Sequence, residues 1–270
     1  MIAGLDIPTQ TLFGVRVAAL RMPEVLDRVH AAILARAPLQ IGVVNAAKLV
    51  KMRRSEQLTR DMLDCDLVLA DGMGVVWASR ILKRELPERV AGIDLMHGML
   101  ARGVVHGYRV YCLGATQEVL DRALAVFRTD YPGVKFVGSH HGYFSAEEES
   151  AVAADIQQAR PDILFVAMTS PRKEQFIARW MDHLGVSVCH GVGGSLDVVS
   201  GKVRRAPELW QRLGLEWLYR VKQEPGRLWR RYLVTNALFI ALIIRELSRG
   251  ARTGPGREDD ERSQSTTKEK

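Results

Sequence analysis

Residues 66–76 read Asp66-Leu67-Val68-Leu69-Ala70-Asp71-Gly72-Met73-Gly74-Val75-Val76. An apolar run of this length, followed by glycines and a helical pattern, indicates a buried strand that leads into a helix. In an open α/β sheet, ligands bind outside the carboxyl ends of the strands. Asp71 stands at such an end, so its carboxylate is placed to act on a ligand. A role as turn former or helix N-cap is an equal alternative for this residue on its own.

The same alternation of apolar runs and helical patterns extends along the chain. The predicted strands are 41–45, 67–70, 109–113, 134–139, 163–168 and 186–191. The predicted helices are 47–63, 74–82, 95–106, 117–130, 146–159 and 172–184. This order favours an α/β fold with a mostly parallel sheet and helices on both faces.

The net charge of +7 is concentrated in one segment of the 270 residues. Residues 201–252 hold 12 Lys and Arg against 4 Asp and Glu, whereas residues 1–200 are neutral. From about Ala206 apolar residues recur at helical spacing, Pro225 interrupts them, and a second helix is expected over Leu228–Leu247. We therefore expect a core over 1–205, a basic helical appendage over 206–247, and a disordered polar tail over 248–270.

The appendage has the pattern of a helix that lies on a membrane surface. Its apolar stretch Leu233–Ile244 is about a dozen residues long, whereas a bilayer span takes roughly 20. Basic residues at its ends and tryptophans before it predict an interfacial helix drawn to anionic lipid. A helix packed on the domain is the alternative, and nucleic acid is not expected because no nucleic-acid motif is present. The residues assigned to the membrane surface are Arg220, Arg227, Trp229, Arg230 and Arg231.

Two further strand-to-helix turns are candidates for binding phosphate. Gly114, in Leu113-Gly114-Ala115-Thr116, begins a turn that can seat a phosphate on helix amides, although a plain turn explains it equally well. Arg172 and Lys173 open a helix, where cations oppose the dipole, and this favours a nearby anion such as a diphosphate.

The segment from Gly191 to Arg205 adds glycines and charge. Gly193 and Gly194 belong to a glycine-dense turn, which indicates close approach of a ligand or of a neighbouring helix. Asp197 is placed to contact a sugar hydroxyl, and Arg204 and Arg205 extend the basic surface. Arg89, in a Pro- and Gly-flanked loop, offers a bidentate fork to phosphate or is a solvated surface arginine.

Cysteine and histidine usage points away from metal. The three cysteines have no metal-type spacing and lie in apolar stretches, so we expect buried free thiols and a reducing compartment. The seven histidines show no pairing at i, i+4, and no structural metal is predicted. The N-terminal residues lack the pattern of a secretory signal, so none is expected.

Taken together, these stretches resemble the WecG/TagA/CpsF family of bacterial glycosyltransferases. The likeness covers roughly residues 10–245 and is most specific in residues 70–76, 86–92, 191–201 and 202–232. The resemblance implies a Rossmann-like core and an inverting sugar transfer that needs no metal or other cofactor. It implies a UDP-sugar donor, of the N-acetylmannosamine type or carrying glucose or glucuronate. The implied acceptor is a sugar linked through diphosphate to undecaprenol, in exopolysaccharide or teichoic acid-type synthesis at the cytoplasmic face of the plasma membrane.

Three site residues follow from the resemblance by position. Asp71 matches the proposed catalytic base, Asn45 the asparagine of the Thr-x-Asn motif, and Arg89 the arginine after Pro-Glu. In two places the chain departs from the family pattern: Val43 replaces the usual threonine, and Lys173 replaces the glutamine of Pro-Lys-Gln-Glu. A soluble nucleotide-sugar enzyme and a non-catalytic membrane-associated scaffold are the alternative functions. Assembly into a homo-oligomer is left open by the sequence.

Overall fold

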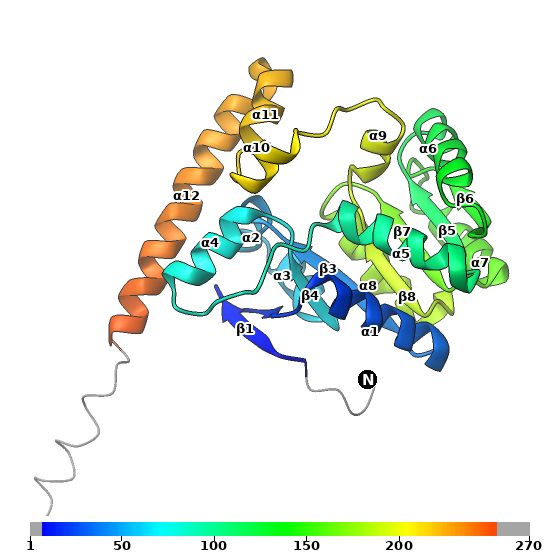
Figure 1. Cartoon of the computed structure of the whole chain (residues 1–270), viewed down its shortest axis with the longest axis horizontal. Coiled ribbons are helices and arrows are strands. Elements are labelled where there is room, and N and C mark those ends of the chain that lie inside the picture. The colour runs from blue at the N-terminus through cyan, green and yellow to red at the C-terminus, as the bar shows by residue number, and fades with distance from the viewer. Residues whose placement is uncertain (1–6, 253–270) are drawn as a thin grey trace, which may run out of the picture.

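The computed structural model describes residues 7–252, which form an α/β fold around one parallel sheet (Figure 1). The order of its six strands is β4-β3-β8-β7-β5-β6, and every pairing between neighbours is parallel. The strands are β3 (Leu39–Val44), β4 (Leu67–Ala70), β5 (Arg109–Gly114), β6 (Lys135–His140), β7 (Ile163–Ala167) and β8 (Val188–Gly191). All six predicted strands are confirmed, with ends shifted by at most two residues.

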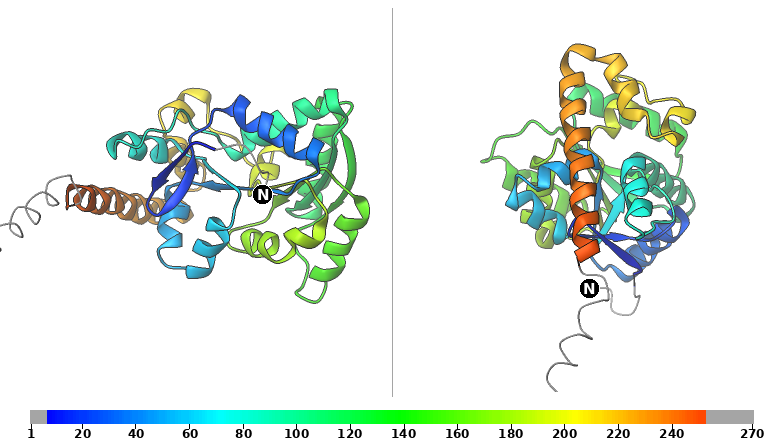
Figure 2. Two further views of the ribbon diagram at one scale, coloured as in Figure 1. Left: turned by 90° about the horizontal axis from the view of Figure 1, so that it is seen from below. Right: turned by 90° about the vertical axis from the view of Figure 1, so that its left-hand side faces the viewer.

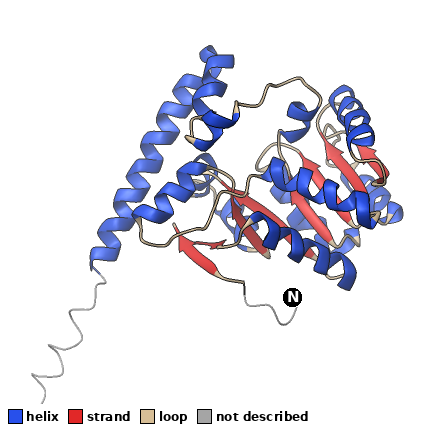
Figure 3. Cartoon of the chain, in the orientation of Figure 1, coloured by secondary structure: helices blue, strands red, loops and turns tan. Residues whose placement is uncertain are grey.

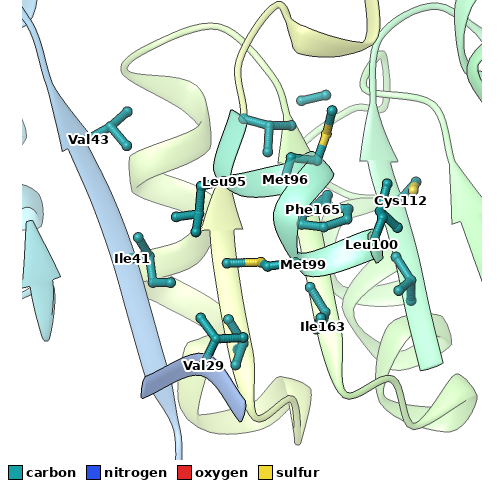
Figure 4. Close-up of a cluster of buried hydrophobic side chains, with 14 of the residues drawn as sticks. Val29, Ile41, Val43, Leu95, Met96, Met99, Leu100, Cys112, Ile163 and Phe165 are labelled. Atoms are coloured by element: carbon teal, nitrogen blue, oxygen red, sulfur yellow. The ribbon is translucent and has the colours of Figure 1, made fainter. Parts of the chain in front are cut away.

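Helices cover both faces of the sheet, as the sequence predicts (Figure 3). One face packs against α1 (Met22–Ala35), α5 (Gly92–His106), α6 (Gln117–Asp130) and the short α9 (Ser195–Val199). The other face packs against α2 (Ala46–Met52), α3 (Glu56–Leu63), α4 (Met73–Ile81), α7 (Glu149–Ala159) and α8 (Arg172–Leu184). Figure 4 shows the first of these interfaces, where Leu95, Met96 and Met99 of α5 lie over Ile41 and Phe165.

The N-terminal part and one helix differ from the predicted pattern. An antiparallel hairpin of β1 (Thr9–Leu12) and β2 (Val15–Ala18) packs beside β4, and neither it nor α1 was predicted. The predicted helix 47–63 is two helices, α2 and α3. The break occurs because Ser55 adopts an extended conformation and its hydroxyl accepts a hydrogen bond from the Leu58 amide, which starts a new helix.

The appendage consists of α10 (Glu208–Arg212), α11 (Glu216–Gln223) and α12 (Pro225–Arg252). Gly214, with a φ of +62°, separates the first two. The predicted end of the last helix at Leu247 is wrong by five residues, and 248–252 are helical rather than disordered. Once a helix is nucleated each added residue gains one hydrogen bond, and no proline intervenes before Pro255. The rest of the predicted tail, 253–270, lies outside the described residues.

Helix α12 runs along the side of the molecule and packs on the core through one of its faces (Figure 2). Phe239 is 6% exposed, and its ring centroid lies 5.6 Å from that of Phe13. An ion pair of 2.8 Å between Arg84 and Glu246 fixes the helix further along. The packed-helix alternative is therefore confirmed for this face.

The opposite side of α12 carries large apolar side chains in contact with solvent. They are Trp229, Leu233, Val234, Ile240, Ile244 and Leu247, which we call the apolar stripe. None of the helices formed by residues 7–252 has the length and apolarity needed to cross a bilayer.

Replacing Phe239 by alanine should test the docking of α12. Loss of a buried phenylalanine typically costs about 3–5 kcal/mol of unfolding free energy, because lost burial and a cavity add. The measurement is urea unfolding, with Ile240→Ala as the matched control on the exposed side of the same turn. We expect the control to change stability by less than about 0.5 kcal/mol. Equal small effects of the two substitutions would show that α12 is not docked as described.

Candidate active site

The carboxylate of Asp71 is held where β3, β4 and α5 meet. Its Oδ1 accepts a hydrogen bond of 2.8 Å from the amide of Gly92, the first residue of α5. Its Oδ2 accepts a longer one of 3.5 Å from Nδ2 of Asn45, which follows β3 and caps α2 through the Lys48 amide. Gly72, not Asp71, is the N-cap residue of α4. The alternative of Asp71 as a plain N-cap of the helix that follows it is therefore wrong.

The surroundings of Asp71 raise the pKa of its carboxyl group. The main cause is burial, which withdraws the ionised form from water, and the carboxylate of Glu216 from α11 adds to it. The Gly92 amide, Arg89 and Lys48 act in the opposite direction. A carboxylate with a raised pKa holds a proton more readily than an ordinary aspartate, which suits a general base.

Next to Asn45 a pocket of about 800 Å³ opens along the carboxyl edge of the sheet. This volume lies in the range of roughly 300–1,000 Å³ that small-molecule sites occupy. Among the described residues that line it, Asp197 carries the one carboxylate. The basic side chains of the lining are Lys48, Lys51, Arg54, Arg172, Lys173, Lys202 and Arg231. Such an excess of cations favours an anionic ligand.

Two of these cations are buried and share one carboxylate. Lys48 Nζ lies 2.8 Å and Lys173 Nζ lies 3.5 Å from the same oxygen, Oε1 of Glu174. Burial lowers the pKa of Lys173 to about 8, with the charge of Lys48 contributing. The two lysines hold the pKa of Glu174 below its ordinary value although burial opposes them. The group therefore carries one positive charge that no protein carboxylate within it balances.

Lys173 also explains part of the glycine-dense turn. A Cβ on Gly191 would lie 2.9 Å from Lys173 Cε, and one on Gly193 would lie 3.6 Å from its Nζ. Gly193 moreover has a φ of +54°, which favours glycine. Close approach of a side chain from a neighbouring helix accounts for Gly191, whereas the backbone conformation accounts for Gly193. Gly193, Gly194 and Asp197 all line the pocket, and their role in substrate binding stays a prediction.

Gly114 and Arg204 do not line the pocket. Gly114 has a φ of +130°, and a Cβ there would lie 2.4 Å from the carbonyl of Ala167, so strand packing accounts for the glycine. Its neighbours Ala115 and Thr116 do line the pocket, and Thr116 caps α6. Arg204 is exposed, and its carbonyl accepts a hydrogen bond from Gln223 of α11.

Arg89 and Arg205 face carboxylates rather than the open pocket. Arg89 lies 3.3 Å from both Asp94 and Glu216. Arg205 forms a bidentate pair with Asp94, at 2.7 and 2.8 Å. The Arg89–Glu216 pair joins the core to α11 close to Asp71, and each of the two guanidinium groups faces a carboxylate. Phosphate binding by these two residues stays a prediction.

Several pocket residues were missed by the sequence analysis. Three of them recur every third residue after Asn45, namely Lys48, Lys51 and Arg54. This basic spacing could have predicted that they share one side of the chain. The hydroxyl of Ser170 is buried at the pocket without a hydrogen-bond partner in residues 7–252. Arg172, which was predicted, lines the pocket while its guanidinium lies 4.6 Å above the Phe144 ring.

The residues assigned to the membrane surface lie in different surroundings. Trp229 and Arg230 are exposed on α12, and Arg220 pairs with Glu216 at 3.3 Å. Arg231 instead lines the pocket, together with Thr235 of the same helix. Arg227 lies in the first turn of α12. Across residues 7–252 no three His, Cys, Asp or Glu side chains gather as metal ligands would.

Comparisons with known proteins show the family of the chain. Residues 10–253 match the model of the family described as glycosyl transferase, WecG/TagA/CpsF. One similar protein is the N-acetylglucosaminyldiphosphoundecaprenol N-acetyl-beta-D-mannosaminyltransferase of Bacillus spizizenii, 36% identical over 181 residues, or 67% of this chain and 69% of that protein. A protein of the same name from Staphylococcus aureus is 39% identical over 163 residues, or 60% of this chain and 63% of that protein.

The pKa of Lys173 predicts how anion binding depends on pH. Its ammonium is charged below about pH 8 and neutral above it, so the affinity for UDP should fall as pH rises through that value. Lys173→Gln should weaken UDP binding about tenfold or more, because a hydrogen bond to a charged group contributes about 1.5–3 kcal/mol. Isothermal titration calorimetry between pH 7 and 9 measures both effects. Lys202→Gln, at the exposed rim of the pocket, is the control, and UDP binding by this variant should keep the pH dependence. If UDP binding by Lys173→Gln also kept the pH dependence, a group other than Lys173 would be responsible for it.

Proposed function

Because the chain belongs to the WecG/TagA/CpsF family of glycosyltransferases, we propose that it transfers an N-acetylmannosamine-type sugar from its UDP conjugate. The proposed acceptor is N-acetylglucosaminyl-diphospho-undecaprenol, the acceptor in the names of both relatives. The observation that carries the proposal is the position of Asp71: it does not itself line the pocket, but it accepts a hydrogen bond from Asn45, which borders this pocket with its seven basic side chains.

In the proposed reaction Asp71 acts as general base. It takes the proton of the acceptor hydroxyl as that oxygen attacks the anomeric carbon of the donor. The bond from this carbon to the diphosphate oxygen breaks on the opposite side, and UDP leaves with the electron pair, which inverts the anomeric centre. The raised pKa of Asp71 favours proton uptake, and the Gly92 amide keeps the carboxylate oriented.

The diphosphate is assigned to the part of the pocket around Lys173. Arg172 and Lys173, which the sequence analysis linked to a diphosphate, both line the pocket. The unbalanced charge of the Lys48–Glu174–Lys173 group and the unpartnered hydroxyl of Ser170 support this assignment. The N-terminus of α8, directly beside them, adds a favourable dipole.

The acceptor is proposed to approach from the side of α12. This helix presents the apolar stripe to the outside, and its Arg231 and Thr235 form part of the pocket wall. A helix that lies in the membrane interface and also borders the pocket would bring a lipid-linked diphosphate close to Asp71. We place the chain as a peripheral protein at the cytoplasmic face of the plasma membrane.

Replacement of Asp71 by asparagine should lower the transfer rate by about 10²–10⁴-fold, the usual contribution of a general base. The assay is transfer from a panel of UDP-sugars to a diphospho-lipid acceptor analogue carrying N-acetylglucosamine. The control is UDP affinity, which should stay within about threefold because the pocket cations remain. A correctly folded variant with nearly full rate would remove Asp71 from the mechanism.

The apolar stripe should be needed for membrane binding. Joint replacement of Leu233, Ile240 and Ile244 by glutamine should weaken binding to anionic liposomes about 100-fold or more, because each apolar side chain contributes roughly 1.5–3 kcal/mol when buried. Liposome sedimentation measures the effect. Leu34→Gln with Val105→Gln, at two apolar side chains that are also exposed, on α1 and α5, is the control.

Undiminished liposome binding by the triple variant would contradict the assignment of the stripe. Deletion of the chain from about Leu209 is a poorer test. It would also remove Phe239 from the core.

A further inference from the structure

A buried histidine lies directly behind the hydrogen bond that holds Asp71. His190 is at the centre of the sheet, on β8, and its exposed fraction is 0%. Its Nε2 lies 3.0 Å from the carbonyl oxygen of Gly92. A carbonyl oxygen only accepts, so the ring donates here and its proton is on Nε2.

The backbone of Gly92 is therefore hydrogen-bonded to two side chains. Its carbonyl accepts from His190, and its amide donates to Oδ1 of Asp71 over 2.8 Å. The residue also packs beside both neighbours, because a Cβ on it would lie in ordinary van der Waals contact, 3.6 Å from the His190 ring and 3.7 Å from Val43. The first residue of α5 is thus fixed between the sheet centre and the carboxylate.

A histidine at this buried position lowers the stability of the fold, which suggests that it has another role. Burial lowers the pKa of its ring to about 4, so it is neutral at physiological pH. The backbone groups of Gly92 and Ile41 oppose this effect, but within the described part of the chain Nδ1 makes no hydrogen bond of normal geometry. A buried polar atom without a partner costs stability, and an aliphatic side chain would avoid that cost.

We propose that His190 is a positioning residue for the catalytic base: by binding the Gly92 carbonyl it holds the first turn of α5 so that the Gly92 amide stays directed at Asp71. This inference rests on the proposed function, in which Asp71 is the base. His190 itself is fully buried, so it acts on the orientation and the pKa of Asp71 rather than on the substrate.

The sign of the expected pKa change follows from the hydrogen bond. The Gly92 amide favours the ionised form of Asp71, so loosening it should raise the pKa of that carboxyl further. The other charged groups that act on Asp71 stay in place when His190 is changed. They are Glu216 on α11, Arg89 before α5, Lys48 on α2, Lys173 on α8 and Arg205 in the loop after α9. Lys48 and Lys173 also act on His190.

The test compares His190→Met, which fills the space without donating, with His190→Gln, which keeps a donor. We expect the methionine variant to lose about 10- to 100-fold in kcat, because a catalytic group misplaced by about 1 Å can cost about 100-fold. The acid limb of its pH–rate profile should move to higher pH, and KM for the donor should change little. The glutamine variant should recover most of kcat and the original acid limb.

Two comparisons distinguish the inference that His190 positions Asp71 from its premise that Asp71 is the base. Cys189→Ala, a change at the neighbouring buried position of β8, should lower stability without moving the acid limb. Asp71→Asn run alongside reports on the premise: its full activity would refute the base itself. If Asp71→Asn is inactive while His190→Met keeps both kcat and the acid limb, the inference about His190 alone is overturned.

A measurement on the unmodified chain covers the case in which His190→Met does not fold. Nitrogen-15 NMR of the histidine rings distinguishes the two neutral tautomers. Protonation of His190 on Nε2 supports the inference, and protonation on Nδ1 would overturn it, because the ring could then not donate to Gly92.

Discussion

The hydrogen bond from the Gly92 amide to Asp71 is the interaction on which the arrangement of the site depends. It joins the carboxyl end of β4 to the N-terminus of α5, and so sets a carboxylate against the positive end of a 15-residue helix. Burial raises the pKa of this carboxyl, and the amide limits the rise. Both the orientation of the base and its proton affinity are therefore decided by where the first turn of α5 lies, which connects the chemistry to the packing of α5 on the sheet (Figure 4).

A second constraint is the positive charge at the pocket, which the carboxylates beside it do not balance. Arg89 and Arg205 are paired with Asp94 and Glu216, and these contacts hold the appendage on the core. Lys48 and Lys173, in contrast, share the single carboxylate of Glu174 inside the pocket wall. A buried cation without its own partner is costly, and an anionic ligand would offset that cost. The difference between the two groups explains why the diphosphate is assigned to the Lys173 side, although both sets of cations are close to Asp71.

Much of the fold follows from the sequence, because each central strand is an apolar run bounded by turn residues. The β1–β2 hairpin was not predicted because Thr9–Ala18 lacks such a run. The full length of α12 was not predicted because its packing on Phe13 is a tertiary contact. At the site, strand ends placed Asp71 and Lys173 at one edge of the sheet, because parallel strands bring their carboxyl ends together, whereas Asn45 was predicted from the family resemblance. The pairing of Arg89 with Glu216 and the burial of Lys48 could not be predicted, because they depend on how α11 and α8 dock.

The most direct test of the account is an experimental structure of the chain with UDP and a short diphospho-lipid acceptor analogue. The account predicts the diphosphate of UDP against Lys173 and Ser170, in the pocket that Asn45 borders, with the acceptor hydroxyl within hydrogen-bond distance of the Asp71 carboxylate. UDP bound instead between Arg89 and Arg205, with Glu216 displaced and the Lys173 pocket empty, would contradict it.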